Sequence, residues 1–345
     1  MMFFTPLKWE KDKLVILDQT LLPLKEKYLE IRDIETLFEA IVKLRIRGAP
    51  LLGIAGAFGV YLGIKDFRGD KEKLLKKMEE TINYLAQSRP TAVNLFWGME
   101  RVRKKIMGNL HLHVEELKEI ALKEAQTILE EDIRTSQKIG EYGSEIILQE
   151  DSVLTHCNAG GLATSGYGTA LAVLFKAHEK GKKLVVYVDE TRPLLQGARL
   201  TTWELQKAGI ETYLICDNMA GVVMKEGKVK KVIIGADRVA SNGDTANKIG
   251  SYSLAILAHY HSIPFYIACP VSTIDFSIKE GKDIPIEERS PEEILTIKGE
   301  RIAPHNTKVY NPAFDVVPYH LITAFITEKG LVYPPFEKNL HKLIE

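Results

Sequence analysis

The segment T-H-C-N-A-G-G-L-A-T at residues 155–164 places Cys157 between a short apolar run and a turn of small residues. A cysteine in this position suits a metal ligand, a buried structural thiol, or a nucleophile or acid–base group at a strand end. Burial is common for cysteine, which favours the structural thiol. However, a glycine-rich turn and a helical segment follow Cys157, and backbone N–H groups at a helix start stabilise a thiolate. These residues alone leave both interpretations open.

Asp237 is the second residue whose position suggests chemistry. It follows the apolar sequence V-I-I-G-A and therefore leaves a strand-like run onto a turn. A turn or capping carboxylate is the simpler interpretation, because aspartate is common in turns. The functional interpretation is a carboxylic acid in apolar surroundings, whose raised pKa lets it donate a proton near neutral pH. Spacing does not separate the two.

A zinc site explains the cysteine and histidine residues less well. His156 and Cys157 are adjacent, so their side chains point apart in an extended chain, and neither H-x-x-x-H nor C-x-x-C occurs. We therefore expect no metal. The three cysteines of the chain, which also include Cys216 and Cys269, give no disulfide framework and indicate a cytoplasmic protein with reduced thiols.

Three cationic segments suit an anion. Arg47 precedes Gly48-Ala49-Pro50 at the start of an apolar helical segment, where free N–H groups would favour a phosphate. Asn247-Lys248 is expected to open a second helix, and Arg89 lies in a break between helices. A solvated surface side chain is the alternative for each cation. Together the segments predict a phosphorylated small molecule as ligand.

The hydrophobic pattern predicts the elements that position these residues. Short apolar runs typical of strands occupy residues 152–155, 184–188, 212–215, 232–234 and 265–268. Helical segments are expected at residues 34–45, 50–64, 115–147, 168–180, 198–208 and 249–261. The glycines at 53, 56 and 59 lie within a helix, so they indicate close helix packing rather than a dinucleotide-binding turn.

These elements predict an α/β protein with two domains. Residues 1–130 form a mostly helical N-terminal domain with a small antiparallel sheet, and residues 131–345 form a Rossmann-like, doubly wound, mainly parallel sheet. Ligands of such sheets bind beyond the carboxyl ends of the strands. Four of the five predicted strands are followed by ionisable groups on turn-forming stretches, and the fifth is followed by Cys269, which indicates a site at that edge.

Composition excludes several function classes. The 46 basic and 46 acidic residues balance, so nothing suggests nucleic acid or a membrane surface as partner. No apolar run approaches a membrane span, and the first residues do not resemble a signal peptide.

Six long motifs resemble the methylthioribose-1-phosphate isomerases, which share a superfamily with regulatory subunits of translation initiation factor 2B. They are R-G-A-P (47–50), R-P-T-A-V-N-L-F-W (89–97), T-H-C-N-A-G-G-L-A-T (155–164), D-E-T-R-P-L-L-Q-G-A-R-L-T-T-W-E-L (189–205), G-A-D-R-V-A-S-N-G-D-T-A-N-K-I-G (235–250) and N-P-A-F-D-V-V-P (311–318). The resemblance extends from about residue 9 to residue 330. Gly161 departs from the alanine expected in the cysteine motif, and Leu51-Leu52 is bulkier than usual, but neither is a reacting group.

The resemblance implies an isomerase that acts in methionine salvage on 5-methylthioribose 1-phosphate, as a homodimer without a cofactor. It assigns Cys157 and Asp237 as the catalytic pair. The implied substrate contacts are Arg47, Gly48, Ala49, Arg89, Gln196, Asn247 and Lys248. In the implied mechanism Asp237 protonates the ring oxygen, and Cys157 assists the transfer from C2 to C1 by proton abstraction or by supporting a hydride shift. Because the site draws on both domains, closure between them is plausible.

Three alternatives remain at this stage. Isomerases of 5-deoxyribose 1-phosphate and of ribose 1,5-bisphosphate would use the same chemistry, although the bisphosphate needs a second phosphate site. A non-catalytic regulatory subunit like those of initiation factor 2B belongs to a different class, and a shared fold does not by itself decide function. That class predicts loss of Cys157 or Asp237, and both are present.

Overall fold

The computed structural model describes residues 4–90 and 92–344. Contacts divide the chain into two units. Of the described residues, those from 4 to 135 and from 161 to 168 form the N-terminal unit, and those from 136 to 160 and from 169 to 344 form the C-terminal unit. The division falls within helix α5 (Val114–Gly143), five residues beyond the expected boundary of 130/131, and assigns the segment after the Cys157 turn to the N-terminal unit. The two units are described separately below.

The N-terminal unit combines a small sheet with helices. Strands β1 (Leu7–Glu10), β2 (Lys13–Leu17) and β3 (Tyr28–Ile31) pair antiparallel in that order, as the sequence predicted. The helices are α1 (Ile34–Val42), α2 (Ala49–Ile64), α3 (Lys71–Ala86), α4 (Val93–Met107) and the first part of α5.

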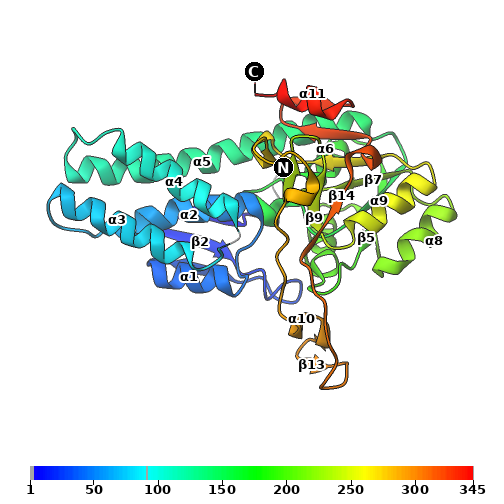
Figure 1. Ribbon diagram of the computed structural model, residues 1–345, viewed down its shortest axis with the longest axis horizontal. Helices are drawn as coiled ribbons and strands as arrows, with labels where there is room; N and C mark the ends of the chain where they lie inside the picture. Colours follow the sequence, from blue (N-terminus) through cyan, green and yellow to red (C-terminus); the bar gives the residue numbers. More distant parts are fainter. Residues whose placement is uncertain (1–3, 91, 345) are drawn as a thin grey trace. The chain divides into compact units, whose positions relative to one another are not determined.

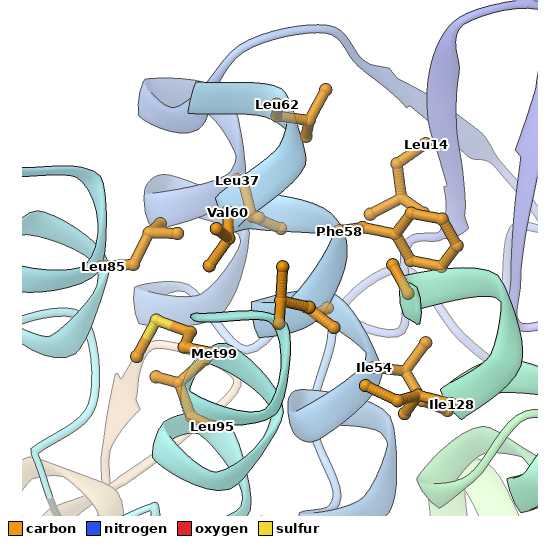
Figure 2. Packing of buried hydrophobic residues seen from close by; sticks show 14 of the residues in the cluster. Leu14, Leu37, Ile54, Phe58, Val60, Leu62, Leu85, Leu95, Met99 and Ile128 are labelled. Atoms are coloured by element: carbon orange, nitrogen blue, oxygen red, sulfur yellow. The ribbon is translucent and has the colours of Figure 1, made fainter. Parts of the chain in front are cut away.

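Helix α2 is the centre of this unit. It is apolar all round, which is typical of a helix enclosed by others, and Phe58 and Ile54 are buried within the cluster shown in Figure 2. A Cβ atom on Gly53 would lie 2.9 Å from the carbonyl oxygen of Asn94, and one on Gly56 would lie 2.8 Å from that of Leu95. The glycines of α2 therefore allow α4 to approach closely, which confirms the expectation of close helix packing.

The C-terminal unit contains a seven-stranded sheet in the order β16-β15-β10-β7-β4-β5-β6. Figure 1 labels two of these strands, β5 and β7. All neighbouring pairs are parallel except β15 with β16. The strands are β4 (Asp151–Thr155), β5 (Leu184–Asp189), β6 (Glu211–Ile215), β7 (Lys231–Ile234), β10 (Phe265–Ala268), β15 (Ala324–Thr327) and β16 (Gly330–Val332). The five predicted strands are thus confirmed within one or two residues, and the sheet is mainly parallel, as predicted.

A second, four-stranded sheet in this unit did not appear in the sequence interpretation. Its order is β11 (Ile274–Asp275), β8 (Arg238–Ala240), β9 (Thr245–Lys248) and β14 (Phe314–Val317). Strands β12 (Thr296–Ile297) and β13 (Glu300–Arg301) form a separate hairpin. The four-stranded sheet matters for the site, because β8 and β9 carry or flank three of the predicted site residues.

The helices of the C-terminal unit connect these strands. They are α6 (Ala170–Glu179), α7 (Thr202–Lys207), α8 (Ala220–Lys225), α9 (Ser251–Tyr260), α10 (Glu292–Leu295), α11 (Phe336–His341) and the end of α5. A π-helical turn, Gly197–Thr201, precedes α7. The expected helix over 249–261 begins later than predicted, at Ser251. No helix within the described residues is long and apolar enough to span a bilayer.

Candidate active site

The nine predicted site residues fall in both units. Cys157, Gln196, Asp237, Asn247 and Lys248 belong to the C-terminal unit, and Arg47, Gly48, Ala49 and Arg89 belong to the N-terminal unit.

Two threonines hold the Cys157 turn at the carboxyl end of β4. Cys157 has a positive φ of 63°, which is uncommon for a residue with a side chain. Its N–H donates to Oγ1 of Thr191 at 2.8 Å, and its carbonyl oxygen accepts from Oγ1 of Thr201 at 2.6 Å. Cys157 is partly exposed. The turn is therefore a strained, fixed platform that presents a thiol, a feature typical of functional positions.

Asp217 fixes the segment that carries Thr191. Its two carboxylate oxygens accept from the N–H groups of Thr191 at 2.7 Å and Arg192 at 2.8 Å. Thr191 itself has a positive φ of 64°, a costly conformation for a β-branched side chain. Asp217 follows β6 and Thr191 follows β5, so the ends of three neighbouring strands cooperate in placing Cys157.

We predict that replacing Thr191 with valine lowers kcat about tenfold, because the N–H of Cys157 loses its acceptor while the side-chain shape is kept. Thr191→Ser keeps the hydroxyl and is expected to retain most activity. Steady-state kinetics of the two variants provide the comparison. Equal activity in both would show that the hydroxyl does not position the cysteine.

Asn158 lies in the same turn and connects it to a buried carboxylate. Its Nδ2 donates to Oε1 of Glu204 at 2.9 Å and to Oγ1 of Thr201 at 3.1 Å. Glu204 is fully buried in α7. A Cβ on Gly160 would overlap the Glu204 carboxylate, so this position in the turn requires glycine.

Asp237 follows β7, a direct neighbour of β4 in the sheet. Its N–H donates to the carbonyl oxygen of Ala246 at 2.9 Å, which fixes it at the start of the β8–β9 hairpin. The turn before it contacts the cysteine turn, because a Cβ built on Gly235 would lie 2.7 Å from Cβ of Ala159. The structure thus brings the segments of Cys157 and Asp237 together within one unit.

The expected dry surroundings of Asp237 are absent, because the residue is exposed to solvent. Of the two interpretations that the sequence left open, the turn carboxylate describes Asp237 in this structure, because the apolar strand before it ends at Ile234 and the residue is exposed at the start of the hairpin. Water must therefore be excluded by a bound molecule for Asp237 to work in a dry environment.

Asn247 and Lys248 are the last residues of β9, not the start of a helix as predicted. Pairing with β14 holds them in extended backbone, with Asn247 opposite Asp315. Asn247 is buried, and its Nδ2 donates to Oγ of Ser251 at 2.9 Å. The Nζ of Lys248 lies 4.7 Å from the ring centre of Phe314. The strand end therefore carries a buried amide and a cation at successive positions, whose side chains point to opposite faces of the strand.

Gln196 lies directly before the π-helical turn and is 8% exposed. Its Oε1 is buried and has no hydrogen-bond partner within residues 4–90 and 92–344. A buried oxygen without a donor costs free energy, so this position is suited to accept a hydrogen bond from a ligand hydroxyl.

His156 forms a buried pair with Asp189. Nδ1 of the ring lies 2.9 Å from Oδ2 of Asp189, and Nε2 lies 2.9 Å from the carbonyl oxygen of Ile249. Burial raises the pKa of the Asp189 carboxyl. For His156, burial opposes the charged ring, but the hydrogen bond and charge of Asp189 outweigh it and raise the pKa. The raised pKa of His156 favours the charged ring, while the raised pKa of Asp189 favours the neutral carboxyl. The two contacts of the ring, one to a carboxyl oxygen and one to a carbonyl oxygen, fit a charged ring that faces a carboxylate.

His156, Asp189 and Asp217 together also have the composition of a metal-binding cluster, with ligand atoms within 4.8 Å of one another. Hydrogen bonds account for the arrangement. Nε2 of His156 faces a carbonyl oxygen, and both oxygens of Asp217 accept from backbone N–H groups.

In the N-terminal unit Arg47 precedes the start of α2. Its Nε donates to Oε1 of Gln19 at 2.9 Å, and Nε2 of Gln19 donates to the carbonyl oxygen of Leu162 at 2.7 Å. Gly48 has a φ of 99°, and a Cβ there would lie 2.5 Å from the backbone of Ala163. Only glycine fits this contact. Ala49 is the first residue of α2, so it contributes one of the free N–H groups of the helix start.

Arg89 lies between α3 and α4 and is half-buried, and its carbonyl oxygen accepts from the N–H of Ala92 at 3.1 Å. Thr91, which belongs to the motif at residues 89–97, lies outside the described residues.

Sequence reasoning missed several residues that position the site. Gln19, Thr201 and Glu204 act through contacts 28 to 143 residues distant in the chain. The sequence signal that could have identified Gln19 was its place in a polar pair, Asp18-Gln19, directly after an apolar strand.

The chain is similar in sequence to a known protein family and to individual members of known function. A family model described as the initiation factor 2 subunit family matches residues 45–334. The methylthioribose-1-phosphate isomerase of Caldicellulosiruptor saccharolyticus is 54% identical over 338 residues, which is 98% of each chain.

Two solved structures are similar over nearly the whole chain. The 5-methylthioribose 1-phosphate isomerase of Pyrococcus horikoshii superimposes with a TM-score of 0.93 at 45% identity, covering 99% of this chain and 95% of that chain. A protein of A. fulgidus, described as the delta subunit of translation initiation factor eIF-2B, has a TM-score of 0.90 at 47% identity and 99% coverage of both. The similar structures thus carry two different functional descriptions.

Proposed function

Because the chain belongs to the initiation factor 2 subunit family and, within it, to the methylthioribose-1-phosphate isomerases, we propose that it converts 5-methylthioribose 1-phosphate to 5-methylthioribulose 1-phosphate. This aldose–ketose isomerisation would serve methionine salvage. The observation that supports this proposal best is a contact between two turns of the C-terminal unit. Ala159, two residues after Cys157, lies against Gly235, two residues before Asp237. An acid and a thiol from neighbouring strand ends suit this reaction.

The proposed reaction begins with ring opening. Phosphate occupies O1 of the substrate, so the sugar cannot open to a free aldehyde, and the bond between C1 and the ring oxygen must break instead. Asp237 donates a proton to the departing ring oxygen. A substrate that covers the exposed carboxyl group would remove water from it and favour its protonated form.

Two routes complete the transfer. In the first, the Cys157 thiolate removes the proton from C2, the enol is reprotonated at C1, and the C2 hydroxyl proton returns to Asp237. In the second, hydride moves directly from C2 to C1 while Cys157 stabilises the developing charge. Deuterium at C2 distinguishes them, because the direct shift retains the label at C1 and the thiolate route allows exchange with solvent.

The remaining residues are proposed to bind the substrate. Gln196 accepts a hydrogen bond from a sugar hydroxyl through its buried Oε1, which has no partner in the described chain. Asn247 and Lys248 offer donors for phosphate or hydroxyl oxygens. Arg47, Gly48, Ala49 and Arg89 are proposed as further contacts. The family resemblance implies these contacts. The guanidinium of Arg47 and the free N–H groups at the start of α2 are suited to bind a phosphate.

The proposal is tested by offering the purified protein three substrates in parallel, without added metal or nucleotide: 5-methylthioribose 1-phosphate, 5-deoxyribose 1-phosphate and ribose 1,5-bisphosphate. We expect the first to turn over fastest. The deoxy sugar lacks only the thioether, so it is expected to react more slowly. If only the bisphosphate turned over, the proposed reaction type would stand but the proposed substrate would be wrong. No turnover would favour the regulatory function described for the A. fulgidus protein.

The proposed enzyme is a cytoplasmic homodimer. The C-terminal unit exposes apolar side chains on its edge strand β6 and on the helices α8 and α9. These two helices contact each other and lie side by side in Figure 1. Leu214 is 52% exposed, Val222 54%, Ile256 42% and Tyr260 80%. Exposed apolar side chains gathered in this way are typical of an interface. The three cysteines are free thiols, which suits a reducing compartment.

We predict that Val222→Glu combined with Ile256→Glu converts a dimer to a monomer, because two buried charges oppose association. Sedimentation velocity provides the measurement, and Leu24→Glu, at a position 91% exposed in the N-terminal unit, is the control. A wild-type monomer would contradict the homodimer, and a double variant that stays dimeric would place the interface elsewhere.

A further inference from the structure

His156 connects three segments of the C-terminal unit that carry proposed site residues. The residue follows β4 and precedes Cys157, its Nδ1 contacts Asp189 at the end of β5, and its Nε2 contacts the carbonyl oxygen of Ile249. Ile249 directly follows Asn247 and Lys248. The ring is 2% exposed, and a Cβ on Gly250 would lie 2.8 Å from its Cε1. The ring therefore packs tightly between the cysteine turn and the turn that follows β9.

The two contacts of the ring require two protons if Asp189 is ionised. The carbonyl oxygen of Ile249 only accepts hydrogen bonds, so Nε2 must carry a proton. An ionised carboxylate also only accepts, so Nδ1 must carry one too. A neutral ring has a single N–H and keeps only one of the two contacts. Loss of the second proton would thus release either the end of β5 or the turn after β9.

The charged groups around the ring favour the doubly protonated form. Asp189 on β5, Asp217 after β6 and Asp315 on β14 are acidic, and each is coupled electrostatically to His156. Oδ1 of Asp189 has no hydrogen-bond partner in the described chain, so this carboxylate depends on His156 for compensation of its charge. Asp315 accepts from the N–H groups of Gly250 and Tyr252 at 2.8 and 3.0 Å, which fixes the same turn from its other side.

We propose that His156 is a positioning residue of the isomerisation: a doubly protonated ring that ties the Cys157 turn and the end of β5 to the turn that follows Asn247 and Lys248. This inference rests on the proposed isomerase function for its effect on turnover. The ring does not touch the reacting atoms in this role. It keeps the thiol and the substrate-binding amide and cation in one fixed arrangement, and it does so only while it carries both protons.

The pH dependence of kcat/KM in Asp189→Asn tests the proposal. Removing the carboxylate charge lowers the pKa of His156, so the ring loses its second proton at lower pH. Since the protonated form is the active one, activity falls as pH rises through this pKa. In the wild type this gives an alkaline limb. In Asp189→Asn the amide can donate to Nδ1 of a neutral ring while Nε2–H still donates to the carbonyl oxygen of Ile249, so both contacts survive loss of the second proton. We therefore expect the alkaline limb that is due to His156 to disappear in this variant. His320→Asn, at an exposed position, is the control and should leave the profile unchanged.

A second measurement reads the ring directly and does not depend on folding of a His156 variant. Imidazole ¹⁵N NMR of the unliganded wild-type protein should show both ring nitrogens protonated at neutral pH, with a titration above the ordinary value of about 6.5. The same signal should titrate lower in Asp189→Asn. A neutral ring at neutral pH, or an alkaline limb that stays at the same pH in Asp189→Asn, would overturn the proposal.

The two measurements separate this inference from the proposed function. If the wild type converts none of the sugar phosphates, the isomerase function and the positioning role in it both fail. A ring that still titrates high and shifts in Asp189→Asn would then uphold the double-donor arrangement as a feature of the fold alone.

Discussion

Replacing Cys157 with alanine is expected to lower kcat for 5-methylthioribose 1-phosphate at least about a hundredfold, the lower range for loss of an acid–base group. Both routes of the proposed mechanism need the sulfur, either to remove the C2 proton or to stabilise charge. Binding should change little, since the turn is held by its backbone contacts to Thr191 and Thr201. Steady-state kinetics and calorimetric titration with product measure the two effects.

Cys216 provides the matched control. It follows β6 as Cys157 follows β4, but it is exposed, and the charge of Glu190 raises its pKa and so disfavours the thiolate. Cys216→Ala is expected to keep nearly normal turnover. Nearly normal turnover in Cys157→Ala would remove this cysteine from the mechanism, whatever the control shows.

Asp237→Asn is expected to have an effect of similar size, at least about a hundredfold on kcat. The amide cannot protonate the departing ring oxygen, while its shape and its backbone hydrogen bond to Ala246 remain. A substrate with a better leaving group at the ring position would be affected less, because it needs less help from an acid. Single-turnover kinetics separate this chemical step from product release.

Exposed aspartates elsewhere serve as controls for Asp237→Asn. Asp283 is exposed in the C-terminal unit, and Asp283→Asn should leave kcat unchanged. If Asp237→Asn raises KM but leaves kcat intact, Asp237 binds the substrate without donating a proton. The exposure of Asp237 makes this distinction important, because its own chain does not provide the dry surroundings that a proton donor at neutral pH requires.

The sequence by itself determined the architecture of the C-terminal unit. Strands that are covered on both faces need apolar residues at successive positions, so β4, β5, β7 and β10 appear as short apolar runs. Polar residues can follow only where the strand leaves the core. For this reason the apolar pattern alone identifies Cys157 and Asp237 as strand-end residues. The glycines of α2 were also interpretable, because a helix that is apolar all round needs small residues where another helix crosses it.

The tertiary structure alone decided how the site residues are held. Asn247 and Lys248 resemble a helix start locally, but pairing with β14, which lies much later in the chain, holds them in a strand. The backbone hydrogen bonds that hold Cys157 come from Thr191 and Thr201. The position of the His156 ring depends on its contact with the carbonyl oxygen of Ile249, 93 residues away. The local hydrophobic pattern indicates which side chains are buried, but it does not indicate which distant residues they contact. Hydrogen bonds between distant segments and the exposure of Asp237 arise only when the chain folds, so no local pattern contained them.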